Sequence, residues 1–387
     1  MRPILLPAVL AGLLSASVPA AAEITQAPAV KTARPLKAET FAQGLVHPWG
    51  MAFLPDGRLL VTERPGRVRI VSKAGKLSAP LQGVPKVYAS GQGGLLDVAL
   101  SPDFATSGIV FLSYAEPRGG SKNGTSVARA KLVADGEGGR LEDVQVIFRQ
   151  EPSYASSQHF GSRIVFTRDG SLFVTLGERY SAREEAQNPA NDLGKLVRIM
   201  PDGSPYAGNP KIAGWRPEIW SIGHRNVQGA ALNPATGKLW TAEHGARGGD
   251  EINIPEAGRN YGWPVITYGR DYSGAKIGVG THKAGMEQPI YYWDPSIAPS
   301  GAAFYTGDAF PEWKGNLFVG ALAGQALHRL VLDGEKVIGE ETLLSDLGER
   351  IRDVRNGPDG VLWLLTDNPE GRVLRVVSPS SQTPSRY

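Results

Sequence analysis

The chain has 387 residues and a formal net charge of +3, and it contains no cysteine. The small charge and the lack of lysine or arginine blocks argue against a nucleic-acid partner. Without cysteine, neither disulfides nor thiolate metal sites contribute, so stability depends on buried apolar area. No linker-like stretch divides the chain, and we therefore expect one large domain rather than two smaller ones.

The first 22 residues have the features of a secretory signal peptide. Met1-Arg2 is basic, residues 4–14 are apolar, and small residues at 20–22 precede Glu23. This pattern predicts cleavage after Ala22. A membrane anchor fits less well, because the apolar run is shorter than the roughly 20 residues that a span needs. We expect a periplasmic or secreted protein with no membrane span in its mature form.

Residues 23–37 are rich in proline and alanine and are predicted to be a flexible lead-in. Residues 38–377 carry the regular patterns and are predicted to form the folded domain. Residues 378–387 are a Ser/Pro/Gln tail without an apolar pattern, which favours disorder.

Within the domain, a strand–turn–strand pattern recurs six times. The copies occupy residues 49–63, 97–114, 162–178, 228–243, 301–321 and 353–367. Three copies have Asp-Gly at the turn, at residues 56–57, 169–170 and 359–360, which is a strong hairpin signal between alternating apolar stretches, and the other three have turns around Pro102-Asp103, residues 234–237 and Gly315. Six such copies predict an all-β fold, a six-bladed β-propeller of four-stranded antiparallel blades. The alternative, a pair of β-sandwiches, is less favoured because the copies do not cluster in two halves.

Two stretches between the copies are long. Residues 179–214 are predicted to leave the sheets as a lid, and residues 258–288 form a second long insertion rich in glycine and tyrosine. Long loops on one face of a rigid scaffold usually carry function.

Residues 222–271 concentrate donors, acceptors and glycines. Arg225 can donate several N–H groups to an anionic oxygen. Carboxylates and carbonyls nearby are the hard oxygen ligands that Ca²⁺ takes, and they include Asp250, Glu251, Asp271 and the carbonyls around Gly245. A cation beside an arginine suits an anionic ligand.

Several motifs of this chain occur in the same order in one known family. They are Gln92 in a glycine-rich turn, Gln158-His159, Asn191-Asp192, His224-Arg225-Asn226, Glu243-His244-Gly245, Ala298-Pro299-Ser300 and Arg350-Ile351-Arg352. Together they closely resemble the soluble glucose/sorbosone dehydrogenases, which use pyrroloquinoline quinone (PQQ) and Ca²⁺ on a six-bladed propeller. The resemblance implies a dehydrogenase that oxidises the anomeric carbon of aldoses to lactones by hydride transfer to the quinone.

The resemblance assigns catalysis to His159 and Arg225. In the family, the histidine takes the proton of the sugar C1 hydroxyl, and the arginine with Ca²⁺ polarises the quinone. A histidine suits this task because its ordinary pKa of about 6.5 lies near working pH, although isolated histidines are more often structural. Gln158 stands where well-known members carry an aspartate. The base is therefore either less activated, or assisted by a carboxylate from elsewhere.

The remaining site residues also follow from the resemblance. Cofactor-binding residues are expected to be Gln92, Arg225, Asn226, Arg350 and Arg352, with Tyr291 and Trp293 as an aromatic cover. Alternatively, Arg350 and Arg352 pair with Glu349 or Asp353 on a solvated surface.

Metal ligation is implied for two ions. The carbonyls of Gly245 and Ala246 are expected at the cofactor ion, and Glu251, Tyr261 and Asp271 at a second ion. Without the resemblance, Gly-Gly-Asp-Glu is most often a solvated turn. Ala323 aligns with a lysine that binds a cofactor carboxylate, so binding is weakened or another cation such as Arg247 compensates.

Two other functions remain open. A catalytically silent propeller that binds a carbohydrate or protein is encouraged by Gln158 and Ala323. A Ca²⁺-dependent lactone hydrolase needs a metal-bound water and no converging arginines, so Arg350 and Arg352 argue against it. The expected partners are a sugar and an electron acceptor, and the expected assembly is a monomer or homodimer.

Overall fold

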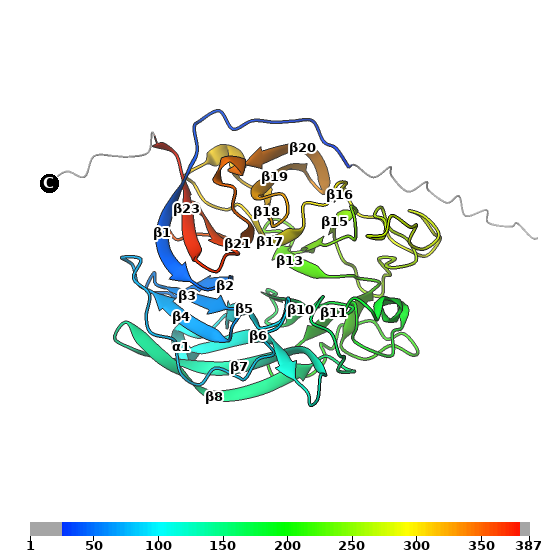
Figure 1. Cartoon of the computed structure of the whole chain (residues 1–387), viewed down its shortest axis with the longest axis horizontal. Coiled ribbons are helices and arrows are strands. Elements are labelled where there is room, and N and C mark those ends of the chain that lie inside the picture. The colour runs from blue at the N-terminus through cyan, green and yellow to red at the C-terminus, as the bar shows by residue number, and fades with distance from the viewer. Residues whose placement is uncertain (1–24, 380–387) are drawn as a thin grey trace, which may run out of the picture.

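The computed structural model describes residues 25–379, and in them six antiparallel sheets surround a central axis (Figure 1). Five sheets have four strands, and the β2-β3-β4 sheet has three. The predicted six-bladed propeller is thus confirmed, with one blade a strand short. The predicted signal peptide and nearly all of the predicted tail lie outside the described residues.

The blades follow one another along the chain. Blade 1 contains β2 (Pro48–Phe53), β3 (Leu59–Glu63) and β4 (Arg67–Val71). Blade 2 contains β5 (Leu95–Leu100), β6 (Ile109–Pro117), β7 (Asn123–Asp135) and β8 (Gly138–Arg149). Blade 3 contains β9 (Gly161–Phe166), β10 (Leu172–Leu176), β11 (Lys195–Ile199) and β12 (Ile219–Ile222). Blade 4 contains β13 (Val227–Leu232), β14 (Leu239–Glu243), β15 (Asp250–Asn253) and β16 (Tyr291–Trp293). Blade 5 contains β17 (Pro299–Phe304), β18 (Leu317–Ala321), β19 (Ala326–Asp333) and β20 (Lys336–Leu343).

Blade 6 joins the two ends of the chain. Its strands are β21 (Ile351–Asn356), β22 (Leu362–Thr366), β23 (Gly371–Val377) and β1 (Lys37–Leu45), which pairs antiparallel with β23. The described helices are short: α1 (Phe104–Ser107), η1 (Arg183–Gln187), η2 (Pro311–Trp313) and η3 (Ser345–Leu347). In the described part of the chain, none is long and apolar enough to cross a membrane.

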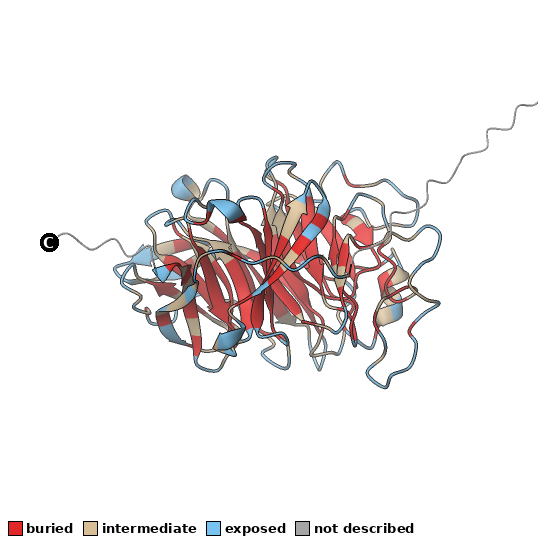
Figure 2. Cartoon of the chain, turned by 90° about the horizontal axis from the view of Figure 1, so that it is seen from above, coloured by how far each residue is buried: buried red, intermediate tan, exposed pale blue. Residues whose placement is uncertain are grey.

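The six predicted hairpins are the first two strands of the six blades. Turn glycines at Gly57, Gly170 and Gly360 have φ of 86°, 83° and 77°, the left-handed region that glycine enters without a steric penalty. The first strands contact each other around the ring, and they and their neighbours are mostly buried (Figure 2). The strands that the hairpin pattern predicts therefore form the interior of the molecule.

A buried ion network joins the first strands of blades 2, 3 and 6. The Arg163 guanidinium lies 2.8 Å from Asp97 and 3.1 Å from Asp353, and it packs over the Trp49 ring at 4.4 Å. Arg355 also contacts both carboxylates. Paired charges of this kind avoid the large cost of a lone buried ion.

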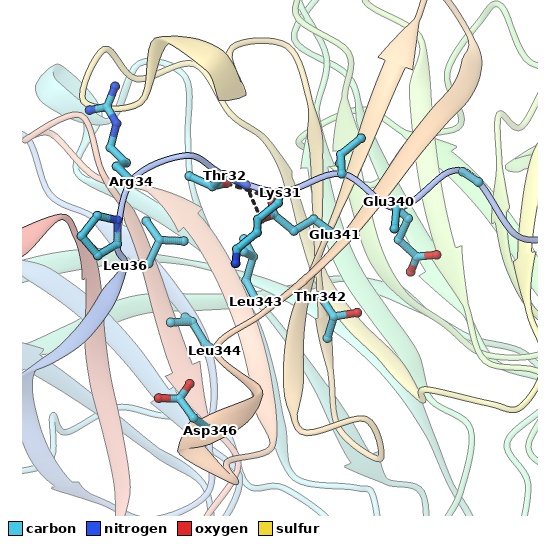
Figure 3. A pocket seen from close by; sticks show the side chains of 14 residues that line it. Lys31, Thr32, Arg34, Leu36, Glu340, Glu341, Thr342, Leu343, Leu344 and Asp346 are labelled. Atoms are coloured by element: carbon cyan, nitrogen blue, oxygen red, sulfur yellow. Dashed lines mark hydrogen bonds between the residues drawn. The ribbon is translucent and has the colours of Figure 1, made fainter.

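Within the stretch predicted to be a flexible lead-in, residues 28–32 pair with the edge strand β20 (Figure 3). Val30 N–H donates to Glu340 O at 3.0 Å, and Thr32 Oγ1 donates to Glu341 Oε2 at 2.8 Å. Thr32 Oγ1 also accepts from Trp313 Nε1 at 2.9 Å. Unpaired strand edges attract such additions. A groove of about 730 Å³ lies between this segment and residues 340–346.

The prediction for residues 179–214 is only partly right. This stretch leaves the sheet at η1, but β11 within it is the third strand of blade 3. Residues 258–288 contain isolated bridges and no named strand, as expected of a long insertion.

Candidate functional site

The candidate residues gather where the first strand of a blade begins and the second ends. Leu176 at the end of β10 pairs with Gly161 at the start of β9. Glu243 likewise pairs with Val227, and Thr366 with Ile351. A hairpin places these ends together, so residues just before the first strand and just after the second become neighbours at one face of the propeller.

His159 and Glu178 meet in this way in blade 3. His159 Nδ1 lies 2.5 Å from Glu178 Oε2, which also accepts the Tyr180 N–H at 2.7 Å. Burial lowers the pKa of His159, and Arg225 lowers it further, while Glu178 opposes both. The ring is therefore neutral near pH 7. With Nδ1–H donated to Glu178, Nε2 is the proton acceptor.

The His159 backbone is held in an unusual position. Its φ is 52°, and its N–H donates to Gln92 Oε1 at 2.9 Å. A Cβ at Gly177 would lie 2.0 Å from the His159 carbonyl oxygen. Only glycine at position 177 lets the end of β10 pass the histidine this closely.

Gln158 is not the group that orients His159. Its backbone carbonyl accepts from Arg179 Nε at 3.0 Å, whereas the carboxylate at the imidazole belongs to Glu178. The sequence left open whether His159 lacks a carboxylate partner or receives one from elsewhere in the chain. The structure shows the second case, with Glu178 as the partner.

Arg225 lies at the start of blade 4 beside His244. Its Nη1 donates to His244 O at 3.3 Å, and its guanidinium packs over Trp263 at 5.2 Å. The carboxylate of Glu243 accepts the Arg225 backbone N–H and fixes this turn. Within residues 25–379, neither Arg225 Nε nor His244 Nε2 has a hydrogen-bond partner, although both are buried. Burial, followed by Arg225 and Arg352, lowers the pKa of His244 well below its ordinary value.

Three arginines surround Asp367 at the end of blade 6. Asp367 Oδ2 lies 2.5 Å from Arg352 and 3.7 Å from Arg350, and Oδ1 lies 3.9 Å from Arg64 of blade 1. Burial opposes ionisation of Asp367, but Arg352 and Arg64 hold its pKa well below the usual range. One carboxylate against three guanidiniums leaves excess positive charge.

Arg350 and Arg352 thus have a different partner from the surface carboxylates considered as an alternative. Glu349 pairs with Arg372, and Asp353 with Arg163 and Arg355. In the described part of the chain, the buried atoms Arg64 Nε and Arg352 Nε also lack a hydrogen-bond partner. Unpaired buried donors are costly, so their convergence suggests a ligand that accepts hydrogen bonds.

Asn226 and Gln92 hold backbone groups of the site. Asn226 Oδ1 accepts the Gly161 N–H at 3.0 Å, and Gln92 Oε1 accepts the His159 N–H. Their acceptor oxygens are therefore used in positioning, and their amide N–H groups are the ones suited to a ligand.

Tyr291 and Trp293 do not lie at this site, contrary to the prediction. They belong to the outer strand β16, in the core cluster between blades 4 and 5. Both donate to the carboxylate of Glu340, Trp293 Nε1 at 2.7 Å. The one-residue difference in their spacing to Ala298 from the family pattern is consistent with a misassignment.

A pocket of about 290 Å³ opens beside Arg225, and its aromatic residues are Tyr180, Trp263 and Tyr272. Its polar lining includes Glu178, Ser181, Arg183 and Asp271. Tyr180 packs edge-on against the His159 ring, with 5.3 Å between ring centroids. Tyr180, rather than Tyr291 or Trp293, is thus the aromatic residue that contacts His159.

Of the predicted metal ligands, Ala246 and Asp271 line this pocket, and Gly245 directly precedes Ala246. Asp250 ties two loops: its oxygens accept from the N–H groups of Gly245 at 2.7 Å, Ile297 at 2.7 Å and Ala298 at 2.9 Å. Asp250 is therefore used in structure and fits a metal ligand poorly.

The residues predicted for a second ion come from three separate segments. Glu251 on β15 accepts from Asn253 Nδ2 at 3.0 Å, Tyr261 donates its hydroxyl to Ile254 O at 2.9 Å, and Asp271 accepts from Ser273. Across residues 25–379, no three His, Cys, Asp or Glu side chains form a metal cluster. A metal site here thus depends on backbone carbonyls, as expected from the sequence for Gly245 and Ala246.

Ala323 and Arg247 are both exposed. Ala323 follows Leu322, whose carbonyl accepts from Arg350 Nη1 at 3.3 Å, so the position borders the arginine group. The extra guanidinium in that group is Arg64, which the sequence interpretation missed.

Three residues were missed, and they share a place in the fold. Arg64, Glu178 and Asp367 each lie one or two positions after the second strand of a repeat, which ends at Glu63, Leu176 and Thr366. The polar residues that follow the second strands are the signal that could have found them.

Comparisons with known proteins agree along most of the chain. The family model for glucose/sorbosone dehydrogenase matches residues 45–375. Aldose sugar dehydrogenase YliI of Escherichia coli (strain K12) is 48% identical over 343 residues, which cover 87% of this chain and 92% of that protein.

Two solved structures are similar throughout. The apo-form of the soluble aldose sugar dehydrogenase from Escherichia coli superposes with a TM-score of 0.85 at 48% identity, covering 89% of this chain and 100% of that chain. The PQQ-bound form of aldose sugar dehydrogenase from Streptomyces coelicolor superposes with a TM-score of 0.73 at 31% identity, with coverage of 89% and 100%.

Proposed function

Since the chain belongs to the glucose/sorbosone dehydrogenase family, we propose that it is an exported, PQQ- and Ca²⁺-dependent aldose dehydrogenase that produces lactones. The observation that carries this proposal is the buried His159–Glu178 pair beside guanidiniums with unpaired donors. A neutral base next to a cationic cradle suits removal of a hydroxyl proton close to an anionic electron acceptor.

The residues present fit PQQ, which is planar and acidic. Arg64, Arg350 and Arg352 outnumber the single carboxylate of Asp367, and fork-shaped guanidiniums suit carboxylates. Arg225 supplies a further donor beside His159. We assign the cofactor's acidic groups to the first three arginines and a quinone oxygen to Arg225, with Asn226 and Gln92 donating through their amides.

Ca²⁺ is proposed at the carbonyls of Gly245 and Ala246, where Asp271 of the same pocket adds negative charge. Hard oxygen donors of this kind are those that Ca²⁺ prefers. A second ion at Glu251, Tyr261 and Asp271 is proposed from the family resemblance, and the separate segments that carry these residues suggest a structural role.

In the reaction, His159 Nε2 takes the proton of the C1 hydroxyl as a hydride leaves C1, so the sugar loses two electrons and becomes a lactone. Glu178 stabilises the imidazolium that forms and keeps the ring in its orientation. When bound, PQQ supplies the acceptor for the hydride. Burial of His159 excludes water, which would otherwise weaken these electrostatic effects.

The test is reconstitution of the purified protein with PQQ, with and without Ca²⁺, followed by dye reduction with a panel of aldoses. We expect sugar-dependent reduction, with lactone as product, only when both are present. Bound PQQ without any sugar oxidation would favour the silent binding propeller. Lactone hydrolysis without PQQ would favour the hydrolase. Export is tested separately, by finding the protein in the periplasm or medium with its N-terminus at Glu23.

A further inference from the structure

Tyr180 is an unusual residue at the pocket mouth. Its side chain belongs to the described large hydrophobic residues that remain exposed, at 45%. Its ring nevertheless packs edge-on against His159, and it lines the same pocket as Arg225. An exposed ring beside a catalytic base leaves one face available to a substrate.

The backbone that carries Tyr180 is strained. Arg179 and Tyr180 have φ of 69° and 66°, a region that bulky residues rarely adopt. The segment is kept there from both sides. The Arg179 guanidinium is buried and bonded to Asn123 and to the carbonyls of Ser156 and Gln158, and the Tyr180 N–H is bonded to Glu178. Strained backbone that surrounding contacts hold in place is commonly found where a side chain has a functional position.

Glu178 connects this strain to the chemistry. One oxygen, Oε2, accepts both the His159 Nδ1–H and the Tyr180 N–H. The position of the aromatic ring is thereby linked to that of the base. A ligand that stacks on the Tyr180 ring therefore lies at a defined distance from the His159 ring.

Sugar rings suit such a surface. The axial C–H bonds of a pyranose carry small positive charges, and the face of an aromatic ring is negative. The pocket volume of about 290 Å³ is near the lower limit of small-molecule sites, roughly 300 Å³, and Arg225 and Ala246, proposed for the cofactor and Ca²⁺, also line it. The pocket therefore favours one sugar ring over a long oligosaccharide. Glu178 and Arg183 add a carboxylate and a guanidinium to the pocket that can bond hydroxyls around the ring.

We propose that Tyr180 is the platform on which the aldopyranose ring stacks, and that it determines sugar affinity; this inference rests on the proposed function. Its contact is with the sugar rather than with the cofactor. Tyr272, 60% exposed on the same pocket, is a second aromatic wall.

The test compares Tyr180→Asn, Tyr180→Phe and the control Tyr206→Asn, which removes an aromatic that packs on Arg198 outside this pocket. Asparagine tolerates positive φ better than tyrosine, so Tyr180→Asn should fold with an equal or higher Tm. Its KM for glucose and xylose should rise about tenfold or more, the usual worth of a lost apolar contact, with PQQ affinity unchanged. Tyr180→Phe and Tyr206→Asn should keep the wild-type KM.

An unchanged KM in Tyr180→Asn overturns the inference. A rise in KM that comes with a similar fold-loss of PQQ affinity, or with a lower Tm than wild type, also overturns it. If the wild type oxidises no aldose, the proposed function fails instead. Saturation-transfer NMR with glucose then still tests Tyr180 itself. Weaker saturation of the sugar C–H protons in Tyr180→Asn than in wild type supports the platform, and equal saturation overturns it.

Discussion

The pair of His159 and Glu178 determines what the site can do, because the carboxylate fixes the imidazole and raises its pKa against the effect of burial. Burial and Arg225 lower the pKa of His159, and Glu178 restores part of the loss. The result is an imidazole that is neutral near pH 7, as the proposed role of a general base requires. The motif identified His159, but its partner lies nineteen positions away in the chain, and only the hairpin brings them together.

Glu178→Gln should move the acid limb of kcat/KM to lower pH. The sign follows from the loss of the one charge that raises the pKa of His159, so the imidazole stays neutral at lower pH. Turnover should fall by roughly 10²–10⁴-fold, since an amide cannot stabilise the imidazolium. A pH–rate profile of both proteins measures this, and an acid limb that stays in place or rises would refute the assigned coupling.

Arg64→Gln should weaken PQQ binding by roughly ten- to a hundredfold, the usual effect of losing a charged donor to a carboxylate. The expected cause is the loss of one of three guanidiniums around Asp367. Titration of PQQ into the protein at fixed Ca²⁺ gives the affinity. The control is Arg58→Gln, whose guanidinium pairs with Asp56 in the β2–β3 turn and should bind PQQ as wild type does. Equal affinities in all three proteins would remove Arg64 from the site.

Among the strands and loops, the sequence predicted the hairpins well but predicted the contacts between distant segments poorly. Asp-Gly turns and alternating apolar residues are local signals, and they identified the first two strands of every blade. Strand β11, the docking of residues 25–36 and the place of Tyr291 and Trp293 depend on contacts between distant segments. Local patterns carry little information about such contacts.

Gly177→Ala tests how strictly the hairpin ends position the base. The added methyl would overlap the His159 carbonyl at 2.0 Å, so the backbone must move. We expect a loss of about 1–3 kcal/mol of stability and, from a shift of the base by about 1 Å, a fall in turnover of about 10²-fold. Gly138→Ala is the control, since its nearest atom would be 3.8 Å away. Urea unfolding measures the stability of each variant, and a turnover assay measures its activity. Wild-type values of both for Gly177→Ala would contradict this positioning role.

For the whole molecule, closure of the ring depends on the N-terminal region. β1 completes blade 6, and the preceding segment crosses to β20 of blade 5 (Figure 1). The chain thus links its first and last blades, which keeps the strand ends that carry the site in register around the axis.

Thr32→Val should lower stability by roughly 1–3 kcal/mol, because it leaves Trp313 Nε1 and the Glu341 carboxylate without the hydroxyl they share. Turnover at 25 °C should not change, as Thr32 lies outside the site. Exposed Thr106→Val, whose hydroxyl bonds only to the Asp103 carbonyl in the described structure, serves as the control and should remain within about 0.5 kcal/mol of wild type. Equal unfolding midpoints for the two variants would mean that the contacts of Thr32 contribute nothing to stability.

In the proposed reaction, His159 removes the hydroxyl proton of the sugar in a pocket that holds PQQ. Stopped-flow absorption of the PQQ-loaded protein mixed with excess aldose tests this role, because it observes the chemical step in a single turnover. Wild type should reduce the bound cofactor rapidly, and His159→Gln should bind PQQ equally well but reduce it about 10²–10⁴-fold more slowly. Reduction at the same rate in both proteins, or bound PQQ that no aldose reduces, would contradict the account.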